Sequence, residues 1–177
     1  LNGASGDTLA QMEKVLGMQR DELNSYLYTY VDSLPNADKY KMNLANSIWF
    51  KDDLRFSVKN SFLQANADYY GADIYKTSFS MDTLKDINNW VNNKTDGMIP
   101  NIIDRIPEET IMYIVNALAF EAEWQEPYKK IRIIDGEFAK ENGENQNVTY
   151  MYSEEGVYLE DEMAKGFLKY YKGSKFA

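Results

Sequence analysis

Hydrolytic chemistry in this sequence would have to rest on carboxylates. The 177 residues include no histidine and no cysteine, which removes the commonest general base, disulfides and thiol chemistry. The acidic residues stand in short clusters, at Asp52-Asp53, Glu108-Glu109, Glu154-Glu155 and Glu160-Asp161-Glu162. A glycosidase needs two carboxylates about 5–10 Å apart across a cleft, whereas adjacent acidic residues in turn-rich stretches are usually solvated surface. A carbohydrate hydrolase is therefore disfavoured, and we expect no enzyme, no catalytic residue, no metal site and no cofactor.

The overall charge narrows the classes of partner. A net charge of −9 disfavours nucleic acid and anionic membrane surfaces. No apolar run approaches the ~20 residues that a membrane-spanning helix requires. The sequence also lacks a glycine-rich loop that could cradle a phosphate. We therefore expect a partner that is neither nucleic acid nor membrane.

One polar residue interrupts the longest apolar stretch of the chain. Residues 111–120 are apolar throughout except for Asn116. The β-branched residues Ile111, Ile114 and Val115, with no glycine or proline, favour a strand buried on both faces over a helix. A buried amide must find hydrogen-bond partners, because leaving it unpaired costs about 1–3 kcal/mol. Asn116 is therefore either a satisfied core residue or a residue with a specific function.

The elements that must position this strand follow from periodicity and turn signals. Apolar spacing and end signals predict helices from Asp7 or Thr8 to Leu16, at Asp21–Leu34, at Ser57–Tyr69 and, capped by Ser80, at Met81–Lys94. Alternation predicts strands at Tyr40–Phe50 and, on a sheet edge, at Ala72–Phe79. Later short strands are expected near Ile131–Ile134, Val148–Tyr152, Gly156–Glu160 and Gly166–Tyr171, between turns at Asp135-Gly136, Asn142-Gly143, Glu155-Gly156 and Lys172-Gly173. No repeat, linker or internal boundary is apparent, so residues 1–177 are expected to form part of one domain.

Two motifs resemble the serpin family, and specifically a bacterial-type member. The run Val115–Phe120, followed by Trp124, Pro127 and Tyr128, resembles the motif of the third strand of the family's large sheet A. The run Ile87–Val91, followed by Thr95, Gly97 and Ile99, resembles helix F and the loop that leaves it. The sequence departs from many relatives at Glu121 and Ala122, where they carry Lys-Gly.

The resemblance implies a fold and the part of it that is present. It implies an α+β class and a partial serpin fold, with helices C to F and strands of sheet A, followed by strands of sheets C and B. The family's opening helices and its C-terminal part, which carries the reactive loop, would lie outside these residues. A stable structure is then expected to need the remaining half of the fold.

The resemblance also implies a function. The first hypothesis is a protease inhibitor of the suicide-substrate type, whose partner is a serine or cysteine protease and whose cleaved loop inserts into sheet A. The alternative is a non-inhibitory serpin relative that acts as a binding, carrier or chaperone-like protein. The segment that matches helix D, Asp21–Leu34, carries no Lys or Arg, so no heparin binding is expected. Family resemblance further implies a secreted or extracellular protein.

Residues of the inhibitory mechanics can be carried over individually. Asn116 matches the buried asparagine of the shutter, where sheet A parts, and its amide is expected to bridge neighbouring elements. Trp124 matches the tryptophan of the breach, where the loop first enters. Asn88, Trp90 and Thr95 match positions that hold helix F on the sheet.

Overall fold

The computed structural model describes residues 1–35 and 39–177. These residues divide into two compact units, one containing Met42–Phe120 with the N-terminal helices, the other containing Glu121–Ala177 with a short segment that ends at Lys41. The combination of helices and mixed sheets confirms the α+β class. The expectation of a single domain without an internal boundary stays a prediction.

The first unit holds the helices and the larger sheet. Its elements are α1 (Gly6–Leu16), α2 (Arg20–Asp32), β1 (Tyr40–Lys51, beginning in the second unit), α3 (Asn60–Tyr70), β2 (Asp73–Thr77), α4 (Met81–Lys94) and β3 (Met112–Ala122, ending there). The strands form one sheet in the order β2-β1-β3, so β2 is an edge strand, as predicted. Strands β1 and β2 run parallel, from the pair Ser47–Asp73 to the pair Lys51–Thr77.

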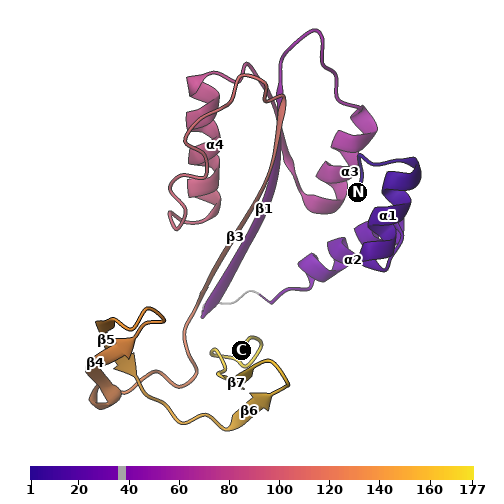
Figure 1. The fold of residues 1–177 in the computed structure, drawn as a ribbon. Helices are drawn as coiled ribbons and strands as arrows, with labels where there is room; N and C mark the ends of the chain where they lie inside the picture. Colours follow the sequence, from indigo (N-terminus) through magenta and orange to yellow (C-terminus); the bar gives the residue numbers. More distant parts are fainter. Residues whose placement is uncertain (36–38) are drawn as a thin grey trace. The chain divides into compact units, whose positions relative to one another are not determined.

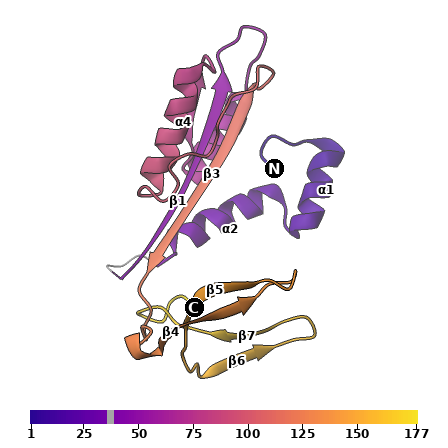
Figure 2. The ribbon, with the colours of Figure 1, turned by 60° about the vertical axis from the view of Figure 1, so that its left-hand side comes forward.

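Strands β1 and β3 run in opposite directions. The amide of Lys51 donates to the carbonyl of Ile111 at 2.9 Å, and further along, the side chain of Asn116 reaches that of Asn46. Later residues of β3 thus lie beside earlier residues of β1, so the two strands are antiparallel. Their arrowheads point to opposite ends of the pair (Figure 2). β3 follows the strand predicted around Asn116.

Helix α4 has the bounds that the sequence predicts because its signals are local. The hydroxyl oxygen of Ser80 accepts from the amide of Asp82 at 3.3 Å, which caps the first turn. The buried residues of the helix recur at helical spacing, at Thr83, Ile87, Asn88, Trp90 and Val91. In Figure 1, α4 lies on one side of the β1–β3 pair and the helices α1 to α3 lie on the other.

The core of the first unit lies between α4 and the sheet. Its buried members are Trp49 from β1, Ile87, Trp90 and Val91 from α4, and Val115 and Ala117 from β3. The Trp49 ring stacks on Tyr75 of β2 with centroids 3.9 Å apart. Apolar burial of this kind is the dominant favourable contribution to folding, and here it holds α4 on one face of all three strands.

The prediction that β3 is buried on both faces is wrong for the described residues. Val115, Ala117 and Ala119 are buried, whereas Ile114 and Leu118 on the opposite face are 68% and 53% exposed. The reason is coverage, since α4 packs against one face of β3 and no described element covers the other. An apolar strand sequence indicates that both faces are suited to burial. It does not identify the elements that cover them, because those lie elsewhere in the sequence.

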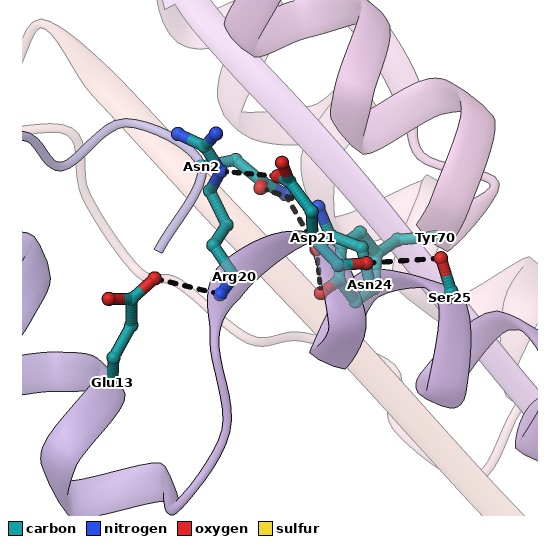
Figure 3. A network of polar contacts seen from close by, with 7 residues as sticks. All are labelled: Asn2, Glu13, Arg20, Asp21, Asn24, Ser25 and Tyr70. Atoms are coloured by element: carbon teal, nitrogen blue, oxygen red, sulfur yellow. Dashed lines mark hydrogen bonds and ion pairs between the residues drawn. The ribbon is translucent and has the colours of Figure 1, made fainter.

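The N-terminal helices are joined by a polar network (Figure 3). Asn24 of α2 is 2% exposed, donates to Asn2 at 2.9 Å, and accepts from the hydroxyl of Tyr70 in α3 at 2.7 Å. Burial raises the pKa of Tyr70. One buried amide thus ties the segment before α1, α2 and α3 together, consistent with the need to satisfy buried polar groups.

The ends of these helices differ from the sequence predictions. Helix α1 begins at Gly6, with Ser5 at the cap position and no side-chain capping bond, so the predicted caps Asp7 and Thr8 lie inside the helix. Gly17 ends it with φ 71°, as the glycine signal predicts. Helix α2 begins one residue early, at Arg20, whose guanidinium pairs with Asp21 at 2.8 Å. The helix predicted from Ser57 begins at Asn60.

The second unit consists of short antiparallel pairs. After the 3-10 turn η1 (Lys130–Arg132), β4 (Ile133–Ala139) pairs with β5 (Asn145–Met151), and β6 (Val157–Glu160) pairs with β7 (Lys165–Leu168). The predicted turn at Asp135-Gly136 is wrong, because both residues lie inside β4. A Cβ at Gly136 would stand 3.0 Å from the ring of Tyr150 on β5, so glycine here makes room for a cross-strand aromatic ring.

The described part of the chain, residues 1–35 and 39–177, lacks two further features. None of its helices has the length and apolar character needed to cross a bilayer. Nor does it contain a group of three or more acidic, histidine or cysteine side chains that could hold a metal ion.

Candidate functional site

Asn88 holds the segment that follows α4. It is 7% exposed, and its Nδ2 donates to the carbonyl of Ile103 at 2.9 Å. Its Oδ1 accepts from the amides of Ile102 at 2.9 Å and Ile103 at 3.1 Å. One side chain from the buried face of α4 thus binds the returning chain at three points. Losing it would leave these partly buried backbone groups without this partner, and an unsatisfied buried group costs about 1–3 kcal/mol at most.

Thr95 organises the end of the same helix. It is completely buried, its hydroxyl donates to the carbonyl of Val91 at 2.8 Å, and its oxygen accepts from the amide of Ile99 at 3.1 Å. The bonds join the last turn of α4 to the first residues after it, where Gly97 has φ 82°. A buried residue with a hydroxyl is required here, because an apolar side chain would leave the Ile99 amide without this partner.

Trp90 connects α4 to the edge strand β2. Its indole Nε1 donates to Oδ2 of Asp73 at 2.9 Å, and the ammonium of Lys94 lies 3.1 Å from the same oxygen. The indole hydrogen bond, followed by the bond and charge of Lys94, holds the pKa of Asp73 below its ordinary value. Lys94 also lies 5.6 Å from the centroid of the Trp90 ring. These side chains form one charged cluster at the edge of the sheet.

Asn116 bridges two strands from the face opposite α4. Its Nδ2 donates to Oδ1 of Asn46 on β1 at 2.8 Å, and Nδ2 of Asn46 donates in turn to the carbonyl of Tyr70 in α3 at 2.9 Å. The expected bridging by the Asn116 amide is confirmed. The expectation that Asn116 is buried is wrong for the described residues, because it lies on the uncovered face of β3. Its role at a shutter stays a prediction.

Trp124 lies in the second unit, among residues of that unit. It stacks on Tyr171 with centroids 4.1 Å apart, and the ammonium of Lys169 lies 5.8 Å from its ring and 4.5 Å from that of Tyr128. Lys169 is 7% exposed and binds the carboxylate of Glu155. The hydrogen bond from Lys169 is the main cause that lowers the pKa of Glu155. A buried cation is thereby both paired and faced by aromatic rings. The role of Trp124 at a breach stays a prediction.

The structure thus groups the predicted residues in three places. Asn88, Trp90 and Thr95 lie together on α4 and its exit, Asn116 lies on the opposite face of the sheet, and Trp124 belongs to the other unit. Sequence reasoning missed Asn46 and Asp73, the partners of Asn116 and Trp90. Neither has a local signal, because the partners are 70 and 17 residues away. Asn88, Thr95, Trp90 and Asn116 each join two elements through hydrogen bonds.

Comparisons with known proteins agree on one family. The profile described as serpin (serine protease inhibitor) matches residues 1–173. The leukocyte elastase inhibitor of Equus caballus is 28% identical over 189 residues, which cover 99% of this chain and 48% of that protein. A solved loop C-sheet serpin polymer has 49% identity and a TM-score of 0.90, with 98% of this chain and 46% of that chain covered.

A second solved structure, also a serpin, is similar to this chain. The thermophilic serpin tengpin in its native state is 48% identical with a TM-score of 0.90, covering 98% of this chain and 45% of that chain. The chain therefore spans about half the length of the relatives it matches. Similarity of this extent confirms the predicted partial serpin fold, and the chain belongs to the serpin family.

Proposed function

We propose that this chain is part of a protease inhibitor of the suicide-substrate type. The proposal rests on family membership and on one structural observation. Within the described residues, β3 has a strand neighbour on one side, β1. The opposite edge of β3 is where a further strand could add through backbone hydrogen bonds, which is the mode of serpin loop insertion.

The chemical step belongs to the protease. Its nucleophile attacks a peptide bond of the reactive loop, the amine leaves, and an acyl-enzyme forms. The freed loop then adds to the sheet beside β3 and carries the attached protease with it, which distorts the protease active site before water can release the acyl group. The inhibitor supplies stored strain for this motion and no catalytic residue of its own.

The residues of the site act on the motion of the sheet. Asn88 and Thr95 hold α4 and its exit against one face, so insertion requires this packing to yield. Asn116 holds β3 to β1 from the other face and thereby keeps the two strands together while the edge of β3 receives the loop. These contacts set rates of sheet opening, and none of them selects the protease.

The test is a covalent trap. The protein at the full length of its relatives is incubated with chymotrypsin-like, subtilisin-like and cysteine proteases, and we expect a complex with a serine protease that survives denaturing electrophoresis. The matched control is the same protease with its nucleophile chemically blocked, which should give no complex. Cleavage of the loop without any complex would support the alternative, a non-inhibitory binding, carrier or chaperone-like protein.

The charges of α2 bear on whether heparin affects inhibition. α2 carries Asp21, Glu22 and Asp32, and its one basic residue, Arg20, is paired with Asp21. We therefore propose that heparin does not accelerate inhibition, and a salt-sensitive acceleration would contradict this. A secreted or extracellular location and a bacterial source likewise stay proposals from family resemblance.

A further inference from the structure

Helix α4 is held differently at the two edges of the sheet. Over β3 the contacts are apolar, between Trp90 or Val91 and the buried residues Val115 and Ala117. At β2, where Tyr75 also packs against this core, directional contacts are added, since Trp90 and Lys94 both bind one oxygen of Asp73. β2 and β3 are the opposite edges of this sheet, so the charged attachment is at the edge far from β3.

The two kinds of contact respond differently to movement. Apolar packing is non-directional and proportional to the contact area, so it weakens gradually as α4 lifts from β3. A hydrogen bond to a carboxylate is roughly twice as strong as a neutral one and requires alignment. Trp90 is 8% exposed and its indole N–H donates to Asp73, so replacing that carboxylate with a neutral acceptor weakens the bond.

We propose that Asp73 is a positioning residue that anchors α4 to the edge strand β2, so that α4 lifts from β3 about this attachment. This inference rests on the proposed function, because loop insertion beside β3 is the event that requires α4 to move. In this role Asp73 acts through Trp90 and Lys94. With the anchor in place, α4 yields at β3 and stays attached at β2.

The test compares two carboxylates that contact the same strand. Asp73→Asn removes the charged acceptor of Trp90. Asp52→Asn is the matched control, because Asp52 pairs with Lys76 of β2 at 2.7 Å and both side chains are more than half exposed. In the full-length protein we expect Asp73→Asn to speed hydrogen exchange of α4 amides and of the Trp90 indole by about tenfold. Asp52→Asn should leave both rates within about twofold.

A double-mutant cycle tests whether Asp73 acts on α4 through the indole N–H of Trp90. Trp90→Phe keeps an aromatic ring and removes the indole donor, so in that background Asp73→Asn should speed α4 exchange much less than tenfold. Lys94→Gln removes the second partner and should give a smaller increase in exchange than Asp73→Asn. It also provides a folded variant if Asp73→Asn does not accumulate.

The outcomes separate this inference from the proposed function. Exchange of α4 that is no faster in Asp73→Asn than in Asp52→Asn, or an effect of full size in the Trp90→Phe background, overturns the anchor. An unchanged rate of loop insertion in Asp73→Asn overturns its role in insertion. Failure of the unmodified protein to trap any protease overturns the proposed function, and the exchange rates then still decide whether Asp73 anchors α4.

Discussion

The two units of the chain bury their residues very differently. Among the described residues, nearly all buried side chains belong to the first unit, where α4 packs against the sheet, and the second unit contributes Tyr40 and Lys169. The second unit leaves large apolar side chains exposed, among them Ile131 of η1 at 86%, Met163 between β6 and β7 at 95% and Phe167 of β7 at 55%. The first unit therefore carries its own core, whereas the second unit buries few of its side chains.

The largest expected effect is on the folding of this chain in isolation. Residues 1–177 alone should lack a sharp, reversible thermal transition as a monomer, because the second unit and the outer face of β3 expose apolar surface and a strand edge that invites association. Calorimetry with sedimentation measures this directly. A cooperative, reversible transition of the monomeric chain would contradict it and would show that the second unit needs no further cover.

A pair of isoleucine truncations sharpens the contrast between the units. Ile87→Ala in the core of the first unit, where Ile87 is completely buried, should destabilise the full-length protein by about 2–5 kcal/mol through lost burial and a cavity. Ile131→Ala in the second unit, judged by its exposure here, should stay within about 0.5 kcal/mol. Denaturant unfolding measures both. A large loss at Ile131 would show that this side chain is covered in the full-length protein.

A pair of asparagine truncations compares the two faces of the sheet. Asn88→Ala removes three bonds to the partly buried backbone of Ile102 and Ile103 and should cost about 1–3 kcal/mol. Asn116→Ala removes one exposed bridge and should cost about 0.5–1.5 kcal/mol. If Asn116 also holds the sheet closed, its variant should polymerise or self-insert its loop faster on mild heating. Timed native gels that show equal rates would leave Asn116 as an ordinary structural residue.

The smallest expected effect concerns one carboxylate in each unit. The pKa values of Asp73 and Glu155 are both lowered by donors. The stabilisation from each is therefore present above the pKa of the unfolded chain and is lost as the pH falls through the lower pKa of the folded state. Carboxyl carbon NMR shifts followed against pH should place both below the ordinary values for their residue types. If either carboxylate titrated at its ordinary pKa, its hydrogen-bond donor would not stabilise the charged form as proposed.

The sequence predicted best those features whose causes are local. The bounds of α4 follow from a capping serine and from apolar residues at helical spacing, all within fifteen residues, and the glycine that ends α1 is also a local signal. The exposure of Asn116 and the continuation of β4 through Gly136 depend on other elements, namely α4 and Tyr150. Asp73 was missed for the same reason, because an acidic residue at the start of a strand does not reveal that a tryptophan seventeen residues later donates to it.

The three tryptophans of the chain give it built-in optical reporters. Trp49 is 3% exposed, stacks on Tyr75 and donates to the hydroxyl of Ser47 at 2.8 Å, so its emission should be blue and insensitive to aqueous quenchers. Trp90 shares that dry environment but senses the carboxylate of Asp73. Trp124, half-buried against Tyr171, should emit further to the red. Variants that keep one tryptophan each would therefore let loosening of the sheet, release of α4 and rearrangement of the second unit be timed as separate fluorescence signals.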